Sequence, residues 1–324
     1  MKKKYMIIII IIGLCIILAI LNRNRIIHPI VERISIQFYG EPIEDGVINN
    51  KYFKINSRKK EAESTTSGIN EALLYCNKRN IKNVKLEKGD YLIDDSISIP
   101  SNINLDLNNS SIYMMPNKNK GYILLKMSNT VNTSLYNGNL IGDREEHEYI
   151  EDSTHEWGMG ISVIGGENIS IQNMNIEKMT GDGIYITNGR ENSNNINIMG
   201  CSIHNNRRQG ISIISAENVE IRFNEIYNIN GTLPQSGIDL EANNTKQKID
   251  KIQIHDNKLY NFKEKLAIIL YKQIYNIDIF NNELYGNIKI NDSNGIVRIN
   301  NNKILSGIIE YDKNNANIFV ENND

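Results

Sequence analysis

A Gly-Ile pair opens four short stretches of alternating apolar and polar residues in the middle of the chain. The pairs are spaced by 23, 27 and 27 residues and stand at Gly160-Ile161, Gly183-Ile184, Gly210-Ile211 and Gly237-Ile238. Alternation with a period of two is typical of a β-strand that buries one of its faces. A strand that recurs at a nearly constant spacing predicts a solenoid, in which each turn adds one strand to a stack.

A second set of alternating segments recurs along the same part of the chain. Eight of them begin at Thr133, Ile169, Ile196, Val219, Ile252, Ile277, Val297 and Ile318. Their aligned sixth positions are Gly138, Met174, Cys201, Asn224, Asn257, Asn282, Asn302 and Asn323. Successive asparagines in one column predict an internal ladder of amides that bond to the next turn, with coincidence in an Asn-rich chain as the alternative. Units of 20–36 residues are too short for propeller blades, so we predict an all-β chain folded as a single-stranded parallel β-helix.

The residues before the repeats predict a cap and a lead-in. Ser67 is a candidate helix N-cap, and apolar residues at helical spacing after it predict a short amphipathic helix over residues 68–79. Such a helix would cover the open end of the first turn of a solenoid. We expect a lead-in over residues 26–59, with one short strand at residues 34–39, and a β-helix domain over residues 60–324.

Three segments at the start of this domain carry a resemblance to a known family. They are TSGINEAL at residues 66–73, KLEKGDY at residues 85–91 and ISIP at residues 97–100. Together they resemble the opening of the pectate lyase superfamily, which includes the family-28 polygalacturonases. The resemblance implies an N-terminal capping helix followed by a right-handed parallel β-helix, and it is more specific for this fold than for an activity.

The positions that match the polygalacturonase site carry other residues in this chain. Family-28 enzymes place Asn-Thr-Asp, Asp-Asp and Gly-His-Gly on three successive turns, whereas residues 158–160, 181–183 and 208–210 read GMG, GDG and RQG. Asp182 is shared, but Gln209 stands in place of the histidine, so the resemblance does not bring the polygalacturonase mechanism with it. The stretch from residue 206 to residue 243 looks more similar to β-helix proteins of bacterial and phage surfaces.

The first 25 residues have the composition of an export or anchor segment. Three lysines at positions 2–4 precede an apolar run over residues 5–21, and no small-x-small cleavage site follows. We expect a signal-anchor at residues 1–25, with a cleaved signal peptide as the alternative, which places the body outside the cytoplasmic membrane. The formal net charge of −2 gives no support for a nucleic-acid partner.

Polar residues of the Gly-Ile repeats gather on one predicted outward face. The two longest insertions, residues 142–158 and 229–248, flank this face and predict the walls of a binding groove. The predicted catalytic residues are Asp182, Asp239, Glu241, Arg208 and His155. The predicted substrate-binding residues are Glu156, Trp157, Tyr185, Arg207 and Gln209.

Each of these assignments has a structural alternative. Asp182 could bond turn amides, the arginine pair could be solvated, and the loop residues could be ordinary loop. Asp239 and Glu241 would repel each other unless they share a partner, which makes a Ca²⁺ ion or a substrate group an alternative. No Cys and His cluster for a metal is predicted.

The residue types in this cluster fit two reactions on polysaccharides. Hydrolysis of a glycosidic bond needs two carboxyl groups, one of them with a raised pKa. β-Elimination of a uronide needs a base and a cation that neutralises the sugar carboxylate. We therefore expect a lyase or glycoside hydrolase that acts outside the membrane on an acidic or acetylated glycan. The alternative is a non-catalytic carbohydrate-binding or structural surface protein.

Overall fold

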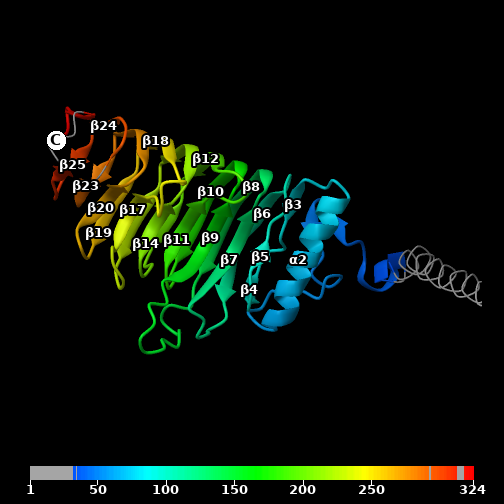
Figure 1. Ribbon diagram of the computed structural model, residues 1–324. Helices are drawn as coiled ribbons and strands as arrows, with labels where there is room; N and C mark the ends of the chain where they lie inside the picture. The colour runs from blue at the N-terminus through cyan, green and yellow to red at the C-terminus, as the bar shows by residue number, and fades with distance from the viewer. Residues whose placement is uncertain (1–31, 34, 292, 312–316) are drawn as a thin grey trace, which may run out of the picture.

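The computed structural model describes residues 32–33, 35–291, 293–311 and 317–324. In this part of the chain the strands wind into an elongated stack, with helix α2 (Ala62–Lys78) at one end and the last turns at the other (Figure 1). Two sheets, one of nine strands and one of eighteen, enclose a continuous apolar core. The predicted all-β, right-handed parallel β-helix with an N-terminal capping helix is thereby confirmed.

The nine-stranded sheet contains the Gly-Ile repeats, and all of its pairings are parallel. Ile161 pairs with Ile184, Ile184 with Ile211 and Ile211 with Ile238, which is the predicted register. Its strands are β5 (Ile97–Ser98), β7 (Gly121–Ser128), β9 (Trp157–Ile164), β11 (Asp182–Thr187), β14 (Gln209–Ile213), β17 (Ser236–Glu241), β20 (Leu266–Tyr271), β23 (Asn287–Asn291) and β26 (Ile309–Tyr311).

The eighteen-stranded sheet contains the second set of segments, and its pairings are parallel except for the β1–β2 hairpin. The predicted alignment is confirmed along the sheet, from the pair Thr133–Ile169 to the pair Val297–Ile318. Its strands are β1 (Ile43–Glu44), β2 (Val47–Ile48), β3 (Asn83–Lys85), β4 (Asp90–Ile93), β6 (Asn104–Met114), β8 (Val131–Ile141), β10 (Glu167–Glu177), β12 (Ser193–Met199), β13 (Ser202–His204), β15 (Ala216–Arg222), β16 (Glu225–Ile229), β18 (Ile249–His255), β19 (Lys258–Phe262), β21 (Ile274–Phe280), β22 (Glu283–Leu284), β24 (Val297–Asn300), β25 (Lys303–Ile304) and β27 (Ile318–Glu321).

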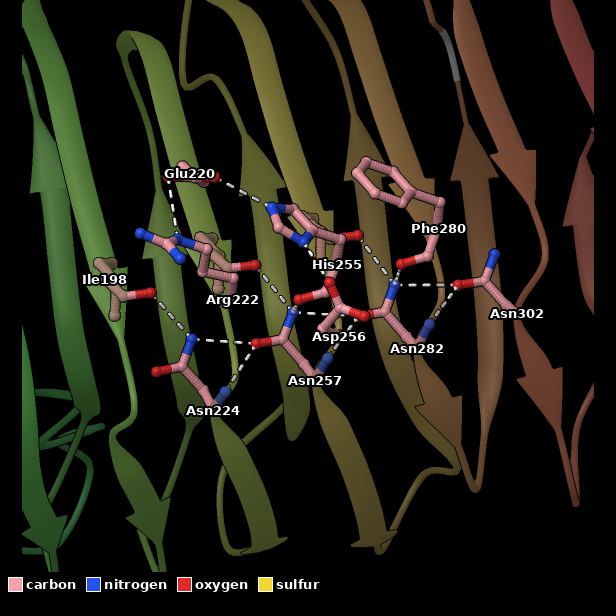
Figure 2. Close-up of polar contacts among 12 residues, drawn as sticks. Ile198, Glu220, Arg222, Asn224, His255, Asp256, Asn257, Phe280, Asn282 and Asn302 are labelled. Carbon is pink, nitrogen blue, oxygen red and sulfur yellow. Dashed lines mark hydrogen bonds and ion pairs between the residues drawn. The ribbon is translucent and has the colours of Figure 1, made fainter.

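The predicted asparagine ladder is present and runs along one corner of the stack (Figure 2). The backbone and side-chain N–H groups of Asn224 both donate to Oδ1 of Asn257, each over 3.0 Å. Asn257 repeats this pattern onto Asn282, and its Nδ2 also donates to the carbonyl of Ile221 over 2.8 Å. Each buried amide therefore holds two turns together and satisfies backbone groups that the corner leaves unpaired.

The corners of the eighteen-stranded sheet use residues with a left-handed backbone. One column of such residues precedes the buried ladder, with φ from 48° to 64° at Asn173, Gly200, Phe223, Asp256, Asn281, Asn301 and Asn322. A second column, on the outer surface, has φ from 49° to 55° at Asn132, Asn168, Asn195, Asn218, Lys251 and Asn276. Asparagine tolerates this conformation better than other residues with a side chain, which explains why this chain contains so many.

Helix α2 covers the N-terminal end of the stack and lies against β4 and β5 (Figure 1). It begins at Ala62, earlier than predicted, so Ser67 lies inside the helix and does not cap it. The predicted strand at residues 34–39 is wrong, because the described residues there are helical. The early start of α2 reflects tertiary contacts that outweigh local signals: Thr66, in the first turns of α2, bonds to Asp94 over 2.6 Å.

The predicted signal-anchor at residues 1–25 lies outside the described residues. None of the helices that the structure describes combines the length and the apolar character needed to cross a membrane.

We predict that Asn257→Ala lowers the free energy of unfolding by about 1–3 kcal/mol, because it leaves the buried N–H of Asn224 and the carbonyl of Ile221 unpaired on the preceding turn. Chemical denaturation followed by circular dichroism measures this loss. Asn300→Ala is the matched control, because Asn300 lies on the outer face of β24 beside Phe280. Equal stability of the two variants would contradict a structural role for the ladder.

Candidate functional site

The glycines of the Gly-Ile pairs interrupt the strand alternation and turn two columns of side chains to the same side. A Cβ atom added to Gly183 would lie 2.5 Å from Cγ2 of Ile203 and 2.7 Å from the carbonyl oxygen of Gly210, on the core side. Since Ile184 is also buried in the core, the residue before the glycine points outward, as does the residue after the isoleucine. This geometry brings Asp182 close to Ser212 of the next turn.

Hydrogen bonds and one ion pair join these outward residues into a continuous row. Arg208 Nη1 lies 3.0 Å from Oδ2 of Asp182, and Ser212 Oγ donates to the same oxygen over 2.8 Å. Gln209 bridges the turns, because its Oε1 accepts from Arg208 over 2.9 Å and its Nε2 donates to Oδ2 of Asp239. The row Asp182–Arg208–Gln209–Asp239, with Ser212, is called the acidic row below.

The carboxyl groups at both ends of the acidic row have raised pKa values. Burial raises the pKa of Asp182 from 3.8 to about 6, against the opposing effects of Arg208 and the Ser212 hydroxyl. Burial, followed by the charge of Glu241, raises the pKa of Asp239 from 3.8 to about 7. Desolvation disfavours the charged form of a carboxyl group, so each exchanges its proton near neutral pH.

The structure brings Asp182, Arg208, Gln209 and Asp239 together as predicted, but it buries them more than the sequence suggested. Asp182 is 0% exposed and Asp239 is 3% exposed, although both point away from the core. Polar atoms in this layer lack partners in the described structure, namely Asp239 Oδ1, Ser236 Oγ and Arg208 Nε. Unpartnered buried polar atoms are rare in native proteins and often mark functional positions.

Residues around the acidic row form its accessible rim. Trp157 is 48% exposed, and the guanidinium carbon of Arg208 lies 6.0 Å from the centre of its ring. Glu156, Tyr185 and Glu241 are half-buried. Glu156 and Glu241 act on the acidic row through their charges, since they raise the pKa of Asp182 and Asp239 respectively.

His155 belongs to a different network, inside the loop between β8 and β9. Asp143 Oδ2 lies 2.7 Å from Nδ1 of His147, whose Nε2 lies 2.8 Å from Nδ1 of His155. His155 Nε2 accepts the backbone N–H of Ile150 over 3.0 Å. That acceptance fixes the proton of His155 on Nδ1, so both neutral rings donate toward the carboxylate of Asp143. The imidazole of His155 therefore holds the loop and does not join the acidic row.

Sequence reasoning missed Asp143 and His147, and their spacing of four residues in a polar insertion gave no signal that would set them apart. All three side chains of this network are buried, with exposures of 4%, 7% and 0% for Asp143, His147 and His155. They fix the conformation of the residues that precede Glu156 and Trp157.

Arg207 braces the two long loops that were predicted to flank the site. Its Nη1 donates to the carbonyl of Thr154 over 2.6 Å, and its own carbonyl accepts from the N–H of Thr232 over 2.8 Å. Arg144 of the first loop donates to Oδ1 of Asn230 over 2.8 Å. The loops are thus tied to each other on one side of the nine-stranded sheet, and Arg207 acts between them.

Within the described ranges, no three carboxylate, imidazole or thiol groups are placed so that they could hold a metal ion. Asp239 and Glu241, which the sequence suggested as partners of Ca²⁺ or a substrate, lie close enough for the charge of Glu241 to raise the pKa of Asp239. Asp239 Oδ2 is bonded to Gln209, and Glu241 is on the rim.

Comparisons with known proteins find two similar curated proteins, and no family model matches the chain. The SPbeta prophage-derived uncharacterized protein YorA of Bacillus subtilis is 32% identical over 217 residues, which cover 58% of this chain and 37% of that protein. The uncharacterized protein YclG of the same organism is 30% identical over 205 residues, covering 55% and 35%. The matched region spans little more than a third of the length of either relative.

Solved structures share the architecture at low sequence identity. The polygalacturonase from Erwinia carotovora superposes with a TM-score of 0.57 and 16% identity, covering 77% of each chain. The tailspike gp49 of Acinetobacter baumannii bacteriophage Fri1, a capsular polysaccharide depolymerase, gives 0.56 and 12%, covering 87% of this chain and 59% of that one. The A-module of the mannuronan C-5 epimerase AlgE4 of Azotobacter vinelandii gives 0.56 and 13%, covering 85% and 94%. The chain therefore has the parallel β-helix fold that these structures share, as its opening segments predicted.

Proposed function

We propose that this protein acts on a polysaccharide and hydrolyses glycosidic bonds at the acidic row. The observation that carries the proposal is the pair of carboxyl groups with raised pKa values on one face, bridged by Arg208 and Gln209. Support also comes from the depolymerase and the polygalacturonase that share the fold, because their names place their activity on polysaccharides.

Asp239 is suited to the role of general acid. Its pKa of about 7 keeps a large fraction protonated at neutral pH, and its Oδ1 has no partner in the described structure. An unpartnered protonated oxygen can donate to the oxygen of a glycosidic bond. Asp182 is suited to the role of base, because Arg208 and Ser212 favour its charged form and so hold its pKa below that of Asp239.

The spacing of the two carboxyl groups favours attack by a water molecule. Asp182 lies on β11 and Asp239 on β17, with β14 between them. Two steps between parallel strands separate the backbones by about 10 Å across the sheet, and Asp239 also stands three residues further along its strand than Ser236, the residue aligned with Asp182. Glycosidases that place a water between their carboxyl groups keep them about 6.5–9.5 Å apart, whereas a covalent intermediate needs about 5 Å.

Elimination is less well supported than hydrolysis. A lyase needs a cation that is available to the carboxylate of the sugar. Arg208 is instead bound to Asp182 through Nη1, at 3.0 Å from Oδ2. The Arg208 side chain is 16% exposed and lies beside Trp157.

A second candidate function is that of a non-catalytic carbohydrate-binding or structural surface protein. The burial of both carboxyl groups favours this function. A buried pair that is bonded to protein partners can connect neighbouring turns without taking part in any reaction. The exposed Trp157 ring and the half-buried Tyr185 could then bind sugar rings without chemistry.

We also propose that the β-helix lies outside the cytoplasm and is held at the cell membrane by residues 1–25. The support is the sequence pattern of three lysines followed by an apolar run. External protease applied to intact cells should digest the lead-in and release the β-helix. Protection in intact cells, with digestion only after lysis, would overturn the proposal.

The proposed activity is tested by incubating the purified full-length chain with a panel of acidic, acetylated and neutral polysaccharides. New reducing ends report hydrolysis, and the absorbance of unsaturated uronides reports elimination. We expect Asp239→Asn and Asp182→Asn each to lower kcat by about 10²–10⁴-fold, as loss of a general acid or base does. Glu283→Gln is the control, because Glu283 lies 3.8 Å from Lys258 on the outer face of the other sheet, away from the acidic row. Glycan binding without any cleavage would favour the second candidate.

The stability of the fold should depend on pH through the carboxyl group of Asp239. Because folding raises the pKa of Asp239 from 3.8 to about 7, the proton stabilises the folded state; this contribution is complete below about pH 4 and lost as the pH rises through 7. Asp239→Asn imitates the protonated form, so its advantage over the natural chain should grow from pH 4 to pH 8, by at most about 4 kcal/mol. Thermal unfolding across this range measures the difference. A constant difference at every pH would show that the charged form carries no burial cost.

A further inference from the structure

A polar groove lies on the outer face of the eighteen-stranded sheet, away from the acidic row. It has a volume of about 530 Å³ and crosses β12, β15, β18 and β21. Its floor is one column of outward side chains, in which Asn197 pairs with Glu220, Glu220 with Gln253 and Gln253 with Asp278. The floor thus alternates amide and carboxylate groups on four neighbouring turns.

Two further columns border this floor. On one side stand the left-handed corner residues Asn195, Asn218, Lys251 and Asn276, which also line the groove. On the other side stand Arg222, His255 and Phe280, which Figure 2 shows next to one another on neighbouring turns. The rings of His255 and Phe280 are stacked, with centroids 4.6 Å apart. The groove therefore runs along the stack beside a border of polar corner residues, and a column with an aromatic surface adjoins its floor on the other side.

The two carboxylates of the floor are already paired, and Lys251 adds one exposed cation at the border. Glu220 lies 3.1 Å from Nε of Arg222 and 3.1 Å from Nε2 of His255. Asp278 lies 3.2 Å from Nη1 of Arg298. A carboxylate that is bound to a cation still accepts hydrogen bonds with its remaining lone pairs. Compared with an unpaired carboxylate, it repels anionic ligands less and attracts cationic ligands less. Selection by net charge is thus weak here.

The amide groups of the floor have unused hydrogen-bonding capacity, and Gln253 is exposed. Asn197 Oδ1 is buried and has no partner in the described structure, and Asn197 and Gln253 each offer both donor and acceptor atoms. Hydroxyl groups, which donate and accept at once, match such a surface. Rows of hydroxyl groups at a regular spacing along a chain are the property of an oligosaccharide, and the stacked rings of the adjoining column offer an apolar contact for its C–H groups.

We propose that this groove is a second glycan-binding site, which takes an uncharged oligosaccharide lying along the stack. It does not depend on the acidic row, since the two sites lie on different sheets. Its ligand class also differs from that of a site built around carboxyl groups and an arginine. The groove would hold a neutral portion of a glycan whether or not the acidic row cleaves one.

Calorimetric titration of the full-length chain with cellohexaose, mannohexaose, chitohexaose and hexagalacturonate tests the proposal. We expect at least one neutral hexasaccharide to bind, with an affinity that changes less than about twofold between low and high salt, because screening acts on charges. Gln253→Ala and Asn197→Ala should each weaken that binding by about tenfold, through the loss of hydrogen bonds in the floor.

Two control variants make the outcome specific. Gln172→Ala removes an outward amide from β10 of the same sheet, beyond the turns that line the groove, and should leave binding unchanged. Asp239→Asn should also leave it unchanged, so a failure of the proposed hydrolysis would not affect this result. The proposal is overturned if no neutral hexasaccharide binds, or if binding survives both floor variants in full. Preferential, salt-sensitive binding of hexagalacturonate that the floor variants abolish would equally overturn it.

Discussion

The structure depends on the requirement that every turn of the chain bend at the same places. Parallel strands stack in register only when each turn repeats the backbone shape of its neighbours, and the corners of the eighteen-stranded sheet do this with left-handed residues. A left-handed residue costs about 1–2 kcal/mol for most side chains, and less for asparagine. The buried Asn224–Asn323 ladder offsets that cost, because its amides pair backbone groups on two turns at once.

Because the corner residues and the buried ladder set the shape of each turn, the outward side chains are free to vary. The core columns are occupied by isoleucine, valine and leucine at nearly every turn, whereas the outward columns change in charge and size from one turn to the next. In a solenoid each turn contacts only its neighbours, so an energetically unfavourable feature lowers the stability of only a few turns. The acidic row lies between β11 and β17, with further turns stacked on both sides. Its buried carboxyl groups are therefore placed where the surrounding stack is continuous.

The sequence predicted what repeats and missed what occurs once. The register of Ile161 to Ile238 and the asparagine column followed from periodicity, because identical positions recur on every turn. The gathering of Asp182 and Asp239 followed from the same alignment. Their burial did not, because it depends on the side chain of Arg208 and on single loop contacts that have no period. The network of Asp143, His147 and His155 was equally invisible, since it forms inside one insertion.

The two outer faces show how the same scaffold can treat carboxylates in opposite ways. On the eighteen-stranded sheet, Glu220 and Asp278 are partly exposed and each is paired with an arginine on a nearby outward position. On the nine-stranded sheet, Asp239 is bonded to an amide instead of a cation and is covered, so its proton is held up to neutral pH. The difference arises from the glycines of the Gly-Ile pairs, which turn two columns of side chains to the same outward face. The carboxyl groups of one column then lie close to the polar side chains of the other. A strand with unbroken alternation would have placed Asp182 and Ser212 on opposite faces, and no acidic row would have formed.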